Sequence, residues 1–238
     1  MKSLTKMMTF AIPVVKESEL STAIADRNQP VGILGHYDTE FPTEFVFSPE
    51  LVQKLEDMEV RTLVQRGAGA LQQIPDMAYA DAGAELYDET STIINSSKLL
   101  LKNMPLSLKE LTMLKENQIV LAPFDCSHIS EEHLQHLLKK KISGLDFHLI
   151  RNKDNVSLLK QITNETLNLK ARQIAFNELM LPVILTLVMN KNIRHAMETH
   201  IGILQSIVCY NGVLTNAAIA EKLHSPWTDI LELCWNWN

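Results

Sequence analysis

The sequence has few cysteines, few glycines, no excess of basic residues and no long apolar run. Its three cysteines, Cys126, Cys209 and Cys234, are too few and too scattered for a disulfide framework or a four-ligand zinc site. The 22 basic residues are outnumbered by 28 acidic ones, which argues against a nucleic-acid-binding protein. The longest apolar run, residues 179–189, is too short to span a membrane. We therefore expect a cytoplasmic protein with reduced thiols that binds neither nucleic acid nor a membrane.

Glycine is too scarce for a nucleotide-binding loop. Among the eight glycines, only Gly67 and Gly69 have the G-x-G spacing, and Gln72 stands where the third glycine of a dinucleotide-binding loop would fall. The phosphate-binding pattern G-x-x-x-x-G-K-S/T is also missing from the sequence. We therefore expect no NAD or ATP to bind, and we interpret Gly67-Ala68-Gly69 as a tight turn after a strand.

Between residues 30 and 152, short apolar runs alternate with helical patterns. Ser48-Pro49-Glu50 and the pair Ser107 and Glu110 mark two helix starts, the second as a capping box. Strands alternating with helices of about 10 residues predict an α/β domain whose mainly parallel sheet is flanked by helices, of Rossmann-like or flavodoxin-like type. The apolar runs predict strands at residues 31–34, 60–64, 85–87, 98–101, 119–121 and 142–150.

Residues 164–238 show only helical periodicity, and residues 153–238 are assigned to a C-terminal extension. The pattern predicts helices at residues 166–175, 179–189, 193–210 and 214–223, with Asn211-Gly212 as one of the breaks between them. We therefore expect an all-helical C-terminal extension that packs on the α/β domain. Residues 1–29, with mixed polarity and Pro13, are interpreted as an N-terminal strap along the surface.

Several short motifs follow one another in a specific order. They include Gly67-Ala68-Gly69, Asp81-Ala82-Gly83-Ala84-Glu85 and Asn117-Gln118-Ile119, and residues 137–150 (LLKKKISGLDFHLI) complete the series. In order and spacing they resemble the N-terminal substrate domain of alanine dehydrogenase and of the alpha subunit of proton-translocating nicotinamide nucleotide transhydrogenase. Residues 177–226 are similar to the final helices of that family. The family's nucleotide-binding Rossmann domain lies between these two parts, and about 20 residues here are too few for one βαβ unit.

The resemblance implies a substrate clamp and a catalytic histidine, at positions that hold other residues in this chain. The family's carboxylate-binding arginine corresponds to Glu44, its second lysine to Met104 and its histidine to Asp125, whereas its first lysine is kept as Lys102. Glu44 reverses the charge of the clamp, and an ionised aspartate is a poor proton donor. We therefore expect no catalytic residue, and a vestigial cleft formed by Lys102, Glu44, Asp125 and His128.

Three histidines lie close together in the sequence, at His128, His133 and His136. Beyond Glu132 and Cys126, no carboxylate or thiol completes a set of metal ligands at a firm spacing. We interpret the histidines as an exposed helix face and expect no metal.

The lost positions predict a non-catalytic relative of alanine dehydrogenase that acts as an oligomerising or regulatory interaction module, without NAD. Its expected partner is a second copy of the chain or a full-length homologue. Trp227, Trp235 and Trp237 either anchor an interface or dock the C-terminus on the body. Two alternatives stay open: a sensor of an amino-acid-like molecule in the vestigial cleft, and a residual oxidoreductase that uses a nucleotide domain from another chain.

Overall fold

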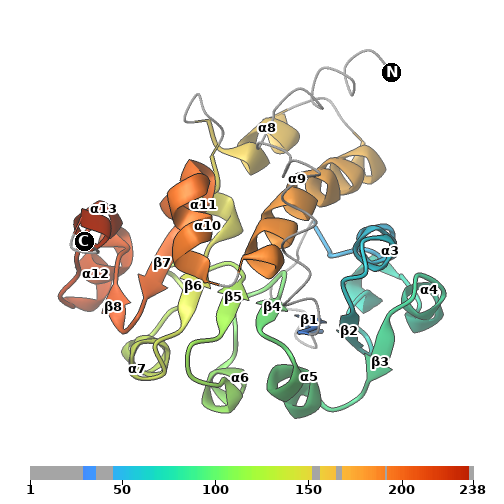
Figure 1. Ribbon diagram of the computed structural model, residues 1–238, viewed down its shortest axis with the longest axis horizontal. Coiled ribbons are helices and arrows are strands. Elements are labelled where there is room, and N and C mark those ends of the chain that lie inside the picture. The colour runs from blue at the N-terminus through green and yellow to red at the C-terminus, as the bar shows by residue number, and fades with distance from the viewer. Residues whose placement is uncertain (1–28, 36–44, 152–155, 165–167, 191, 236–238) are drawn as a thin grey trace.

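A single sheet organises the part of the chain that the computed structural model describes, which is residues 29–35, 45–151, 156–164, 168–190 and 192–235 (Figure 1). The strands are ordered β3-β2-β1-β4-β5-β6-β7-β8. The first six are parallel, and β7 and β8 are antiparallel additions at one edge. The expected α/β fold with a mainly parallel sheet is thus confirmed, in the doubly wound order 3-2-1-4-5-6. The strands are β1 (Val31–Ile33), β2 (Thr62–Gln65), β3 (Glu85–Tyr87), β4 (Leu99–Leu101), β5 (Ile119–Leu121), β6 (Ser143–Leu145), β7 (Ile207–Tyr210) and β8 (Val213–Leu214).

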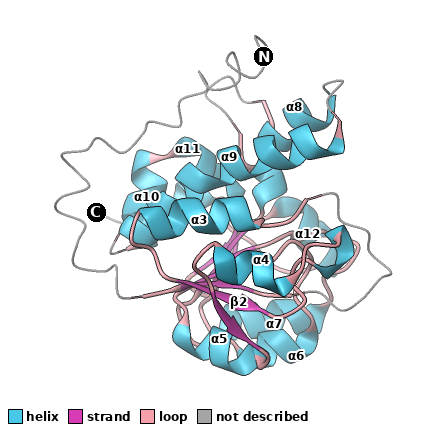
Figure 2. Ribbon diagram, turned by 90° about the vertical axis from the view of Figure 1, so that its right-hand side faces the viewer, coloured by secondary structure: helices cyan, strands magenta, loops and turns pink. Residues whose placement is uncertain are grey.

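Helices cover both faces of this sheet (Figure 2). Helices α5 (Thr90–Ser96), α6 (Leu108–Met113) and α7 (Glu131–Lys139) cover one face. The other face is covered mainly by α3 (Pro49–Asp57), α9 (Leu169–Met189), α10 (Ile193–Thr199) and α11 (Ile201–Ser206). The remaining helices are α4 (Asp76–Asp81), α8 (Leu158–Asn164), α12 (Ala217–Leu223) and α13 (Ile230–Trp235).

The central strands are apolar on both sides because both sides are buried. In β4, Leu99 and Leu101 belong to the core beneath α3 and α9, whereas Leu100 belongs to the core on the α5–α7 side. This continuous apolar character is what a parallel sheet between two helical layers requires. The capping box predicted for Ser107 and Glu110 is present at the start of α6.

Helix α9 joins the C-terminal part of the chain to the α/β body. It runs unbroken where two helices were expected, and it packs beside α3 and α8. The expected gap after residue 175 contains neither glycine nor proline, and Pro182 lies inside the helix. Within the described residues, α9 is the one helix long and apolar enough to cross a membrane, and half of its apolar window is buried inside the protein.

The expectation of an entirely helical extension is wrong at residues 207–214. These residues form a hairpin, β7 and β8, and β7 pairs with β6 to extend the main sheet. Asn211 and Gly212 have positive φ angles of 48° and 83°, as required by the tight hairpin turns that favour Asn-Gly. The predicted helix 193–210 is therefore replaced by α10, α11 and β7. The break was identified correctly, but it connects strands rather than helices.

The turn between β7 and β8 allows a direct test of the hairpin. We expect Gly212→Ala to lower the free energy of unfolding by about 1–2 kcal/mol, because an alanine at this position would have to adopt the left-handed backbone conformation that L residues disfavour. Its Cβ would also lie 3.3 Å from the Leu138 carbonyl oxygen. Gly35→Ala is the control, since its Cβ would meet its nearest neighbours at 3.5 Å without a positive φ. Urea unfolding of both variants measures the difference, and equal losses would contradict the strained turn.

Candidate functional site

The strand order defines where a ligand crevice is expected. In a doubly wound sheet, the connections leave in opposite directions from two neighbouring strands, and ligands bind beyond the carboxyl ends of those strands. Here the two strands are β1 and β4. Gly35 lies just beyond β1, Lys102 follows β4, and Asp125 lies beyond the end of β5. Glu44, the predicted replacement for the arginine, lies outside the described residues.

Lys102 is engaged by a partner within the protein. Its Nζ lies 2.6 Å from both carboxylate oxygens of Glu110 in α6, and the two side chains are 5% and 11% exposed. The Oε2 atom of Glu110 also accepts hydrogen bonds from the backbone N–H and the hydroxyl of Ser107. The positive charge of Lys102, which the sequence analysis placed in the cleft, is therefore neutralised by the carboxylate of Glu110. Met104, two residues further on, is buried and offers no charge.

Asp125 and His128 lie together in the loop before α7. The Oδ1 atom of Asp125 accepts a hydrogen bond of 2.8 Å from the Ser127 backbone, and its Oδ2 lies 3.4 Å from Nδ1 of His128. The same imidazole nitrogen lies 2.9 Å from the Ser127 hydroxyl. The Ser127 N–H is the largest of the causes that hold the pKa of Asp125 below its ordinary value, and His128 adds to it. Asp125 is thus a carboxylate at neutral pH and lacks the proton that an acid catalyst would donate.

A small hollow lies between α6 and α7. Asp125, His128 and His133 contribute its polar lining, whereas neither Lys102 nor Met104 reaches it. Burial lowers the pKa of His133, and its Nδ1 lies 2.6 Å from the Ser130 hydroxyl. Of the predicted site residues, Asp125 and His128 thus line the hollow, whereas Lys102 is paired with Glu110 of α6. The apolar lining consists of Pro105, Leu106, Leu111, Pro123, Phe124, Ile129 and Leu137.

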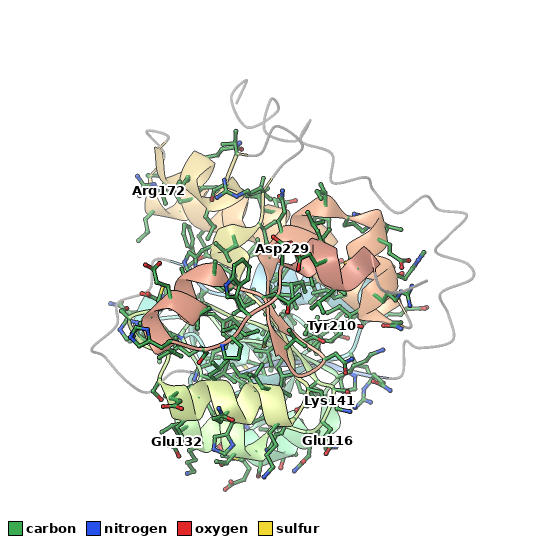
Figure 3. The ribbon with its side chains drawn as sticks, turned by 90° about the vertical axis from the view of Figure 1, so that its left-hand side faces the viewer. Glu116, Glu132, Lys141, Arg172, Tyr210 and Asp229 are labelled. Carbon is green, nitrogen blue, oxygen red and sulfur yellow. The ribbon has the colours of Figure 1, made fainter. Side chains whose placement is uncertain are left out.

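The described residues contain no group of three or more histidine, cysteine or acidic side chains placed to hold a metal ion. On α7, His133 serves in the capping box with Ser130. Figure 3 shows Glu132 on the outer side of this helix, where its side chain is exposed. His133 thus acts in helix capping, and His128 contacts Ser127 and Asp125 in the loop before the helix.

A family model identifies the chain. Residues 45–164, from the segment before α3 to the end of α8, match the model described as Alanine dehydrogenase/PNT, N-terminal domain. The chain belongs to this family. The match includes Lys102, Met104 and Asp125, so the family assignment covers most of the predicted site.

Two solved structures are similar to this member of the alanine dehydrogenase/PNT N-terminal domain family. One is described as L-alanine dehydrogenase, with 15% identity, a TM-score of 0.49 and coverage of 56% of this chain and 36% of that chain. The other is a transhydrogenase from Sinorhizobium meliloti, with 20% identity, a TM-score of 0.44 and coverage of 55% and 38%. The chain thus spans little more than a third of either structure's length. No curated protein matches it.

Side-chain amides that the sequence interpretation missed hold the first matched segment, residues 45–48. Gln173 of α9 pairs with both backbone groups of Val46, accepting at 3.0 Å and donating at 2.6 Å. Asn103, beside Lys102, donates a hydrogen bond of 3.0 Å to the backbone carbonyl of Phe45. Asn177 donates a hydrogen bond of 2.7 Å to the Ser48 hydroxyl. Gln173 and Asn177 are four residues apart and so share a helix face, a signal that the sequence did contain.

The loop that carries Asp125 is tied to the C-terminal part of this family member. Lys222 of α12 donates from Nζ to the carbonyl of Cys126 and, at 3.4 Å, to that of Ile129. Residues after the family match therefore help to place Asp125 and His128.

We expect the Asp125 carboxyl to titrate below the ordinary aspartate pKa of about 3.9. Because the folded-state pKa is lowered, the carboxylate stabilises the fold above the unfolded pKa, and this contribution disappears as the pH falls through the folded value. NMR titration of the side-chain carbon measures the shift. In His128→Ala the pKa should stay depressed, since the Ser127 N–H is the larger cause. Return to the ordinary value in that variant would assign the shift to His128 instead.

Proposed function

We propose that this member of the alanine dehydrogenase/PNT N-terminal domain family performs no hydride transfer of its own and acts as an oligomerising or regulatory module. The observation that carries the proposal is the buried Lys102–Glu110 pair, which leaves the lysine beside β4 without a free charge for an acid substrate. Asp125 supports it, since a carboxylate with a lowered pKa does not supply a proton at neutral pH. The sequence also lacks the glycine pattern of a dinucleotide-binding loop.

The proposed partner is a second copy of the chain or a full-length homologue. Apolar side chains near the C-terminus support an interaction surface: Trp227 is 45% exposed and Leu231 is 51% exposed. Tryptophan contributes strongly to binding where it is buried at the centre of an interface. These residues lie with α12 and α13 at the β8 end of the sheet (Figure 1).

Native mass measurement and an activity assay test the two halves of the proposal. We expect a complex heavier than the 26.9 kDa chain, and no oxidation of NADH in the presence of pyruvate and ammonia. Trp227→Ser with Leu231→Ser should weaken the complex, whereas Met77→Ser, at a residue that is 67% exposed on α4, serves as the control. A monomer at every concentration would refute the oligomer, and turnover of NADH would refute the non-catalytic assignment.

A further inference from the structure

We draw no further inference here: the strongest candidate, the hollow between α6 and α7 that Asp125, His128 and His133 line, has room for little more than a water molecule and belongs to the site already described.

Discussion

Replacing Lys102 with methionine is expected to lower the free energy of unfolding by about 3–5 kcal/mol, because removal of one partner leaves an uncompensated charge in the interior. The partner left behind is Glu110, whose side chain is only 11% exposed. Its remaining hydrogen bonds, from the N–H and the hydroxyl of Ser107, offset part of that cost. Urea unfolding at neutral pH, analysed as a two-state transition, measures the loss.

A double-mutant cycle separates the ion pair from the packing of the two side chains. Glu110→Gln is the matched second change, because glutamine also serves as the third residue of a capping box and so preserves the start of α6. Each single variant should be less stable than the wild type, and Lys102→Met with Glu110→Gln should lose less than the sum of the two. Additive losses would show that the two groups are not coupled and would remove the main support for the proposed function.

Carboxylate ligands provide a second readout of the same pair. A lysine open to solvent and to acids would bind pyruvate or acetate, and binding to the native state alone raises the melting temperature with ligand concentration. With Lys102 held by Glu110, we expect neither acid to shift the wild-type melting temperature. A concentration-dependent rise would support the alternative of a ligand sensor.

The doubly wound part of the fold was predictable because its signals are local. Strands such as residues 99–101 are continuous apolar runs, and Ser107 and Glu110 show a capping box within four residues. The pairing of β6 with β7 joins segments about 60 residues apart, and no local pattern contains that contact. Asn211-Gly212 is compatible with a helix break and with a hairpin turn, so only the partner strand decides between them.

The positions of the predicted site residues in the fold could not be read from the sequence. The sequence analysis predicts Lys102 and Asp125 in one cleft, whereas in the structure Lys102 is paired with Glu110 of α6 and Asp125 lines the hollow. Glu110 was recognised for its capping role alone. Its contact with a lysine eight residues earlier depends on the angle between β4 and α6, which is a tertiary property.

Phe176→Ala is expected to cost about 3–5 kcal/mol, the range for removing a buried aromatic ring from a core. Phe176 of α9 is fully buried, and its ring stacks on Phe45 at a centroid distance of 4.9 Å. It also contacts Phe47 at 5.5 Å and Phe147, beyond β6, at 5.7 Å. One ring from the C-terminal part thus completes an aromatic cluster whose other members come from the α/β body. Thermal unfolding measures the loss.

The elements that lose hydrogen-exchange protection in Phe176→Ala show whether the C-terminal helices and the α/β body share one core. Leu169→Ala is the control on the same helix, because Leu169 is 64% exposed, and an exposed substitution of this kind changes stability by about 0.5 kcal/mol or less. If the core is shared, Phe176→Ala should weaken hydrogen-exchange protection in β1 and β4 as well as in α9, within a single unfolding transition. If protection in the sheet is unchanged while α9 alone opens, the C-terminal helices form a separately stable unit, and α9 does not support the sheet.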